Sequence, residues 1–247
     1  ETDGQRLLTD PVLRNRIGSV RRRAEGAVGD VEVPDAVLIS HLHHDHLDRP
    51  SMRRLPTGTM VVGPVGTARV LRGFSDVREV DVGGRVAAGA VAITAVPARH
   101  GGRRMPSGPA APALGYLIEG EHRIYFAGDT DIFPAMADLA PGLDLAILPV
   151  GGWGPTLRGG HMDPERAASA LTLLRPRVAV AVHWGTLWPT GMDRVRRARF
   201  EEPARRFVEA ARAVAPDVSV ALLDPGGYLI LTGDGSIEVG AGADEPG

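Results

Sequence analysis

The sequence predicts an α/β fold whose chemistry lies at the ends of strands. Short apolar runs rich in β-branched residues alternate with amphipathic stretches, which is typical of sheets covered by helices. One such run, residues 36–40, leads directly into a His-Leu-His-His-Asp-His segment at residues 41–46. At 247 residues the chain can bury a sizeable core. We therefore expect a single domain over residues 1–247.

Strands are predicted where apolar residues run or alternate between turn-forming residues. In chain order these stretches are residues 6–9, 36–40, 60–62, 77–82, 86–96, 114–118, 123–126, 143–150, 178–182, 218–223 and 228–231. Gly120 lies between two of them and predicts a hairpin. The arginine run at residues 21–23 is interpreted as a solvated surface, with binding of a substrate phosphate as the alternative. The remaining stretches are predicted to be loops, with a polar tail at the end: residues 14–30, 101–112, 151–161 and 233–247.

Helix starts are predicted by capping residues. Asp163 is a favourable N-cap, Pro164 fits the first turn, and the helix that they begin should end before Pro176. Asp48 precedes a second predicted helix in the same way. The helices predicted besides the one after Asp163 are residues 49–55, 67–72 and 203–214.

Composition narrows the class of protein. The formal net charge is -2 and charged residues make up 23%, so no overall field attracts nucleic acid or an anionic membrane. The chain has no Cys, which leaves His and carboxylates as metal ligands. No apolar run approaches the roughly 20 residues of a membrane span. We expect a cytoplasmic protein that binds a small-molecule substrate, with no nucleic acid, no stable membrane insertion and possible homo-oligomers.

The segment at residues 41–46 is interpreted as half of a metal site. Side chains alternate in an extended chain, so His41 and His43 point the same way and can chelate one ion. A turn after them lets Asp45 and His46 face a second ion. His44 is interpreted as a surface residue. Packing several histidines without a cation would cost repulsion or desolvation, which disfavours a purely structural cluster.

Three more candidate ligands follow apolar strands elsewhere in the chain. They are His100, Asp129 and His183. In a layered α/β domain such strand ends collect at one edge of the sheets. Taken alone, an Asp at a strand end is commonly a turn residue. Together with the cluster, these residues complete five His and two Asp, which suits two ions with one Asp bridging.

The order of these residues resembles the metallo-β-lactamase superfamily over nearly the whole chain. The resemblance implies a four-layer αββα sandwich and two metal ions. It implies one ion on His41, His43 and His100. It implies the second on Asp45, His46 and His183, with Asp129 as the bridge.

Three segments resemble one branch of the superfamily, which contains N-acyl phosphatidylethanolamine phospholipase D and the bacterial ascorbate-phosphate lactonases. They are Leu-Thr-Asp-Pro at 8–11, Gly-His-Met-Asp-Pro-Glu-Arg-Ala at 160–167 and His-Trp-Gly-Thr at 183–186. Members of this branch usually carry a strand with a Gly-His turn ahead of Thr-Asp-Pro, which this sequence lacks. Two explanations are open: the first strand of the domain is truncated in this sequence, or the protein lacks those residues.

The resemblance implies a bacterial hydrolase that uses a metal-bridging hydroxide on a phosphodiester or a related ester or lactone. Zinc is the preferred metal, with Mn or Fe also suited to these ligands. Asp45 is expected to orient the nucleophile, and His161 to contact the scissile phosphate or protonate the leaving oxygen. The structural alternative for His161 is local hydrogen bonding at a helix start. Asp10 is expected to brace a ligand histidine, and the tryptophans at 153, 184 and 188 to line the pocket.

Two other functions are compatible with these residues. A mononuclear iron oxygenase of the persulfide dioxygenase kind carries the same cluster, and metal analysis would separate it from a binuclear hydrolase. A non-catalytic binding protein on the same fold usually has lost ligands, and none is missing here.

Overall fold

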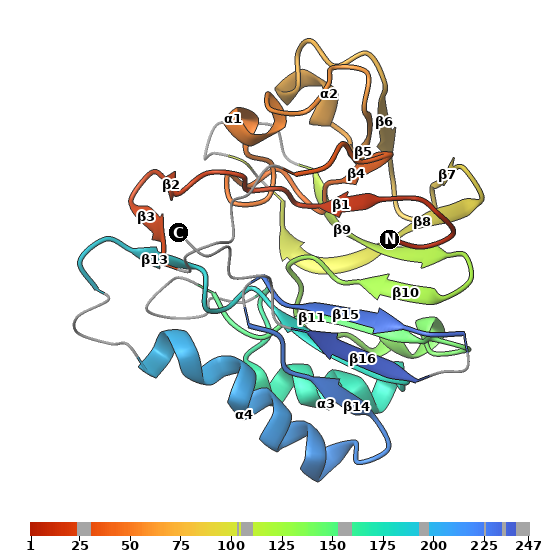
Figure 1. The fold of residues 1–247 in the computed structure, drawn as a ribbon, viewed down its shortest axis with the longest axis vertical. Coiled ribbons are helices and arrows are strands. Elements are labelled where there is room, and N and C mark those ends of the chain that lie inside the picture. Colours follow the sequence, from red (N-terminus) through yellow and green to blue (C-terminus); the bar gives the residue numbers. More distant parts are fainter. Residues whose placement is uncertain are drawn as a thin grey trace.

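Two sheets pack face to face in the computed structural model, and helices cover their outer sides (Figure 1). The first sheet has strand order β1-β4-β5-β6, and the second has order β14-β12-β11-β10-β9-β8-β7. This confirms the expected four-layer sandwich. The structure describes residues 1–23, 31–102, 104, 111–152, 160–192, 198–224, 226–233 and 236–240.

The first sheet is parallel, and its central strands are buried on both faces. Its strands are β1 (Leu7–Thr9), β4 (Ala36–Leu38), β5 (Met60–Pro64) and β6 (Val77–Val80). Helices α1 (Arg49–Met52) and α2 (Thr67–Val70) cover it. Because side chains alternate along a strand, Val37 packs with the helix layer and Leu38 with the second sheet. A continuous apolar run is what such a strand requires.

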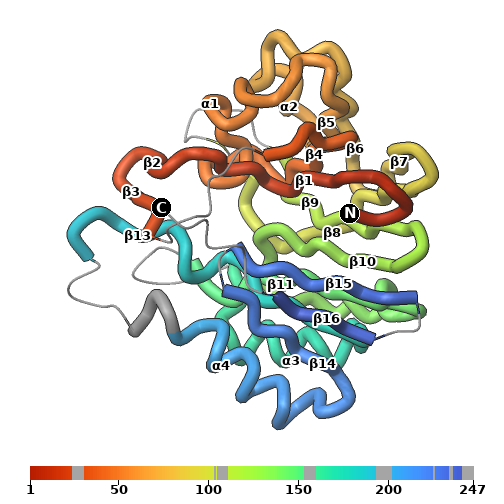
Figure 2. The backbone as a smooth tube through the Cα atoms, in the orientation of Figure 1, coloured from red at the N-terminus to blue at the C-terminus, as the bar shows by residue number. Residues whose placement is uncertain are grey.

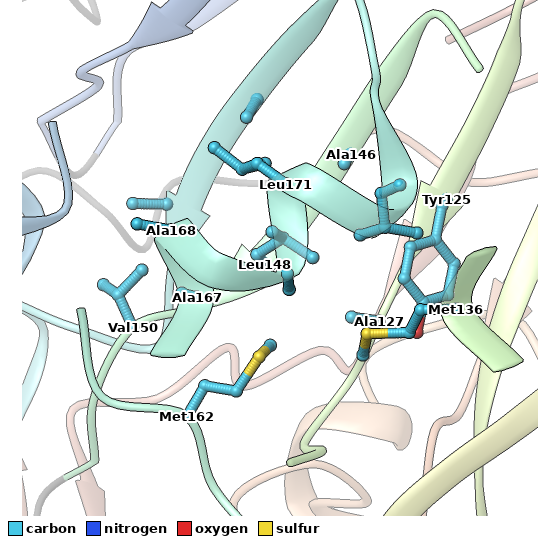
Figure 3. Close-up of a cluster of buried hydrophobic side chains, with 14 of the residues drawn as sticks. Tyr125, Ala127, Met136, Ala146, Leu148, Val150, Met162, Ala167, Ala168 and Leu171 are labelled. Carbon is cyan, nitrogen blue, oxygen red and sulfur yellow. The ribbon is translucent and has the colours of Figure 1, made fainter. Parts of the chain in front are cut away.

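The second sheet is antiparallel from β7 to β10 and parallel from β10 to β14. Its strands are β7 (Arg85–Ala88), β8 (Val91–Gly101), β9 (Pro112–Glu119), β10 (Arg123–Phe126), β11 (Leu145–Pro149), β12 (Val178–Val182) and β14 (Ser219–Ala221). Its outer layer is η1 (Pro134–Leu139), α3 (Pro164–Leu174) and α4 (Ala198–Val214). Leu171 of α3 packs over Leu148 of β11, with Met162 and Tyr125 beside them (Figure 3).

Two smaller sheets correct the sequence prediction. Within the predicted loop 14–30, β2 (Arg16–Ile17) and β3 (Val20–Arg22) form a hairpin, and β3 also pairs with β13 (Leu187–Pro189). Figure 2 shows β3 and β13 side by side although they are far apart in the chain. The prediction failed because the partner of β3 is distant in the sequence, so no local pattern marks it. Residues 24–30 lie outside the described part.

The predicted frayed tail was also wrong in part. β15 (Tyr228–Leu231) pairs with β16 (Ile237–Gly240), and this hairpin packs on the second sheet through Leu229 and Leu231. Residues 241–247, and most of the predicted loop at 103–110, lie outside the described residues. No helix in the described ranges is both long enough and apolar enough to span a membrane.

The helix caps confirm the sequence prediction. Asp163 accepts a hydrogen bond from the backbone N–H of Arg166 at 2.8 Å. Asp48 accepts from the backbone N–H of Ser51 at 3.1 Å and from its hydroxyl at 2.5 Å. Arg14 adds a bidentate contact to Asp48, at 2.8 Å and 2.7 Å. Asp48 therefore ties the segment after β1 to the start of α1.

We expect Asp48→Ala to lower the free energy of unfolding by about 2–4 kcal/mol, because it removes a helix cap and leaves a guanidinium without its carboxylate. Urea denaturation measures the change. Asp76→Asn is the matched control, since Asp76 pairs with Arg78 at an exposed site and should matter by less than about 1 kcal/mol. Equal effects of the two substitutions would contradict the role of Asp48.

Candidate metal centre

Four strands deliver the predicted ligands to one place. The loop after β4 carries residues 41–46, β8 carries His100 near its end, Asp129 follows β10, and His183 follows β12. Gly128 permits the approach of the β10 segment, because its φ is +58° and a Cβ there would lie 2.5 Å from Cβ of Ser40. Asp129, His183 and residues 41–46 thus follow strands, as the sequence predicts. His100 differs, because it lies within β8 rather than after it.

The first group of side chains is His41, His43 and His100, whose nitrogens lie within 4.8 Å of one another. Nε2 of His41 lies 2.9 Å from Nδ1 of His43, and Nε2 of His100 lies 3.3 Å from the same atom. His41 is fully buried. Three imidazole nitrogens that face one point can hold a metal ion.

The second group is Asp45, His46 and His183, again with ligand atoms within 4.8 Å of one another. Oδ2 of Asp45 lies 3.9 Å from Nε2 of His46 and 4.0 Å from Nε2 of His183. The two imidazole rings are stacked, with centroids 5.4 Å apart and an interplanar angle of 16°. The backbone N–H of His46 bonds to the carbonyl of His43 at 3.2 Å, and the His46 ring also lies beside His41 of the first group, with centroids 4.0 Å apart.

Asp129 lies between the two groups and is 2% exposed. Its carboxylate approaches imidazoles from both of them. The distances are 3.2 Å from Oδ2 to Nε2 of His46, 3.9 Å to His41, 4.0 Å to His100 and 3.2 Å to His161, and 3.4 Å from Oδ1 to Nε2 of His183. One carboxylate can therefore reach ions held by either group.

The other nitrogen of four histidines is already occupied. The contacts of Nδ1 are with Ser40 Oγ at 3.0 Å for His41, Asp10 Oδ2 at 2.7 Å for His46, Gly160 O at 2.9 Å for His100 and Gly151 O at 2.8 Å for His183. A carbonyl or carboxylate can only accept, so Nδ1 of His46, His100 and His183 carries a proton. The Ser40 hydroxyl donates to Asp10 and can accept from Nδ1 of His41. In each ring Nε2 is then the atom left for a metal. This arrangement is typical of metal-binding histidines.

Asp10 shows the bracing contact that the sequence predicts. It accepts from the backbone N–H of Ser40 at 2.7 Å and from the Ser40 hydroxyl at 2.5 Å, in addition to His46. Its φ of +42° is in the left-handed region, which Asp tolerates better than most residues. Asp10 therefore orients His46 directly and His41 through Ser40.

Burial keeps two of the histidines neutral. Desolvation lowers the pKa of His41 well below its usual value, with His46 adding to the effect. Desolvation also lowers the pKa of His100, to about 4, although Asp129 opposes it. A neutral imidazole is the form that binds a metal.

The space between Nε2 of His46 and the carboxylate of Asp129 favours a positive charge. Burial opposes the charged form of His46, but Asp129 and Asp10 outweigh it and raise the pKa of His46 well above its usual value. Burial likewise opposes the carboxylate of Asp129, but His183 and His46 hold its pKa well below the usual range. Nε2 of His46 and Oδ1 of Asp129 are buried without a hydrogen bond. The residues therefore fit a metal ion, which would replace the proton and contact both atoms.

Two further histidines, His44 and His161, lie near the two ligand groups. His44 lies outside the groups and contacts Nη2 of Arg104 at 3.1 Å, so it is a surface residue as expected. The side chain of His161 is 23% exposed and joins a further potential ligand group with His100 and Asp129. The sequence had suggested a substrate contact, a proton donor or local hydrogen bonding for His161, but not a metal ligand.

A cavity of about 310 Å³ opens at the second group. Trp184 and Trp188 line it, as predicted, whereas Trp153 lies outside the described residues. Arg22 also lines it, whereas the sequence interpretation favoured a solvated surface for the whole arginine run over phosphate binding and did not single out Arg22. Alternation along β3 is the signal that would have separated Arg22 from its neighbours.

Comparison with known proteins agrees with the fold. Residues 5–184 match a family model described as a beta-lactamase superfamily domain. The chain is 30% identical over 234 residues to a UPF0173 metal-dependent hydrolase of Methanopyrus kandleri, covering 92% of each chain. It is similar to Igni18, a metallo hydrolase of Ignicoccus hospitalis, with 24% identity, a TM-score of 0.68 and coverage of 97% of this chain and 92% of that one.

A further solved structure widens the range of chemistry on this fold. CmlA, a diiron β-hydroxylase from Streptomyces venezuelae, gives a TM-score of 0.62 at 22% identity. The match covers 90% of this chain and 50% of CmlA. This likeness concerns the fold alone, so the reaction has to be argued from the side chains.

We expect Asp10→Asn to weaken metal binding by about 10–100-fold, because His46 loses a charged acceptor that fixes its orientation. Asn tolerates the left-handed backbone at this position, so the change tests the side chain alone. Competition with a chelator measures the affinity. Asp35→Asn is the control, since Asp35 is an exposed carboxylate that accepts from the backbone of Arg6. Unchanged affinity in Asp10→Asn would contradict the bracing role.

Proposed function

The chain belongs to the metallo-β-lactamase superfamily, and from this membership we propose that it is a binuclear metal-dependent hydrolase of a phosphodiester or a related ester or lactone. The observation that carries the proposal is the pair of ligand groups on either side of Asp129. His41, His43 and His100 would hold one ion, and Asp45, His46 and His183 the other. Asp129 would contact both.

Metal ions of this kind lower the pKa of a coordinated water toward neutrality and stabilise negative charge that develops on oxygen. Histidine and carboxylate ligands suit zinc, and also Mn or Fe. Two divalent ions, with zinc preferred, are therefore the proposed cofactors. The burial of His41 and Asp129 keeps bulk water away from the ligands and strengthens their electrostatic contacts.

The protein side chains would orient the reacting groups. Asp45 is partly exposed beside the cavity, so its carboxylate can orient the attacking water while it holds a metal. His161 is the proposed proton donor to the leaving oxygen, since it is the most exposed imidazole that contacts Asp129. Its Nε2 lies 3.2 Å from Oδ2 of Asp129, a position that also suits a ligand. Metal content of a His161 variant separates the two roles.

The substrate class rests on the resemblance of segments 8–11, 160–167 and 183–186 to the phospholipase D and lactonase branch. A cavity of about 310 Å³ suits a small molecule or the reacting end of a larger one. The name of the Methanopyrus kandleri relative, a metal-dependent hydrolase, supports hydrolysis over the oxygenase alternative.

We expect the metal-loaded protein to hydrolyse at least one of bis-p-nitrophenyl phosphate, simple esters, lactones and cephalosporins. Asp129→Ala should lower the rate by more than about 100-fold, because even an outer hydrogen-bonding partner of a metal ligand costs about 10–100-fold. Steady-state kinetics and metal content are measured on the same samples, with Asp76→Asn as control. Full activity in Asp129→Ala would contradict the bridging role, and a single bound iron would favour the oxygenase.

We expect His161→Ala to keep its metal and to lower kcat by about 10²–10⁴-fold on a substrate with a poor leaving group, because general acid catalysis is lost. On p-nitrophenyl esters, whose leaving group needs no proton, the loss should be smaller. His122→Ala is the matched control, since His122 contacts Leu231 and Asp144 away from the centre. Loss of metal from His161→Ala would instead identify His161 as a ligand.

A further inference from the structure

We propose that Arg22 is a specificity-determining residue that binds a carboxylate or phosphate group of the substrate in the cavity beside the metal centre. The inference rests on the proposed function, because it assumes that the cavity is the substrate site. It adds that the substrate carries a second anionic group besides the bond that is broken.

The position of Arg22 is the first observation. Arg22 ends β3 and lines the same cavity as His46, Asp129 and His183. The cavity of about 310 Å³ is small, so one small molecule can contact Arg22 and the metal ligands at once.

The state of the Arg22 side chain is the second observation. Its Nη2 donates to the carbonyl oxygen of Val12 at 2.6 Å, but its Nε is buried and makes no hydrogen bond. No carboxylate of the described residues pairs with it, whereas Arg14 is neutralised by a bidentate contact with Asp48. Burial lowers the pKa of Arg22, which reflects the cost of this charge. A half-buried cation without a counter-charge is stabilised by an anionic ligand.

The wall around Arg22 strengthens such a contact. β3 pairs with β13, which places Arg22 opposite Leu187, and Trp184 and Trp188 line the cavity beside it. An apolar surrounding reduces solvent screening of the guanidinium. The backbone N–H of Arg23 also bonds to the carbonyl of Thr186 at 2.8 Å, which ties β3 to the segment that carries His183. Arg22 is therefore held at a fixed position relative to the metal ligands.

The donors of Arg22 define the ligand chemistry. Nη2 contacts Val12 through one N–H, so Nη1 and the second N–H of Nη2 remain for a ligand, while Nε is buried and makes no hydrogen bond. A guanidinium donates best to planar or tetrahedral oxyanions, through two or more N–H groups. A carboxylate or phosphate fits these donors, and a neutral ester or a cation does not.

The test compares dicarboxylates from malonate to pimelate with monocarboxylates of the same chain length, as ligands of the metal-loaded protein. Quenching of tryptophan fluorescence, checked by calorimetry, gives the dissociation constants. In the unmodified protein one dicarboxylate should bind about tenfold or more tightly than its matched monocarboxylate, because its second group reaches Arg22. 3-Phosphonopropionate in place of the dicarboxylate shows whether the site prefers phosphate or carboxylate.

Variants of Arg22 separate the effect of its charge on ligand binding from the effect of its packing. Arg22→Met should abolish the preference for the dicarboxylate, and Arg22→Lys should retain part of it. Arg21→Met should retain all of it, since Arg21 is exposed on the same strand. Circular dichroism checks the fold of each variant.

Each outcome bears on one proposal. Equal affinity for mono- and dicarboxylates at every length, or a preference that survives in Arg22→Met, would overturn the role of Arg22. Absence of hydrolysis with the preference intact would overturn the proposed function and leave the anion site standing. Hydrolysis by a protein whose ligand affinities do not change in Arg22→Met would overturn the anion site and leave the proposed function standing.

Discussion

The carboxylate of Asp129, buried among imidazoles, is the constraint on which the site depends. An isolated carboxylate at 2% exposure would cost several kcal/mol, and the facing histidines offset that cost, with His183 and His46 contributing most. They come from both sheets, on the segments that follow β4 and β12 and within β8. The centre therefore exists only when the two sheets have packed together, and the close approach at Gly128 is part of that packing.

The ligand groups could be predicted from the sequence because the pattern that marks each ligand is local. An apolar run that ends in His or Asp marks a strand end, and the ends of neighbouring strands meet at a common edge. That reasoning places His100, Asp129 and His183 beside residues 41–46, as the distances show. It does not give the position of His161 against Asp129, because no strand carries His161 and its place depends on how the segment before α3 crosses the centre.

The strands that form the wall of the cavity could not be predicted from the sequence in this way. β2 and β3 are short, and β3 is stabilised by β13, which follows the last ligand histidine. No periodicity within residues 14–23 reports a partner so distant. Arg22 could not be singled out within the arginine run for the same reason, since only a known strand separates it from Arg21 and Arg23. Core strands such as β4 and β12 were found because burial on both faces leaves a continuous apolar run.

The attachment of the β2–β3 hairpin has an evolutionary consequence. The hairpin joins neither of the two main sheets. It is held beside the cavity by the pairing of β3 with β13 and by the hydrogen bond from Arg23 to Thr186. Replacement of its side chains can change which molecules are selected without moving the residues that hold the metals. Recognition and reactivity can then diverge separately among descendants of one ancestral chain.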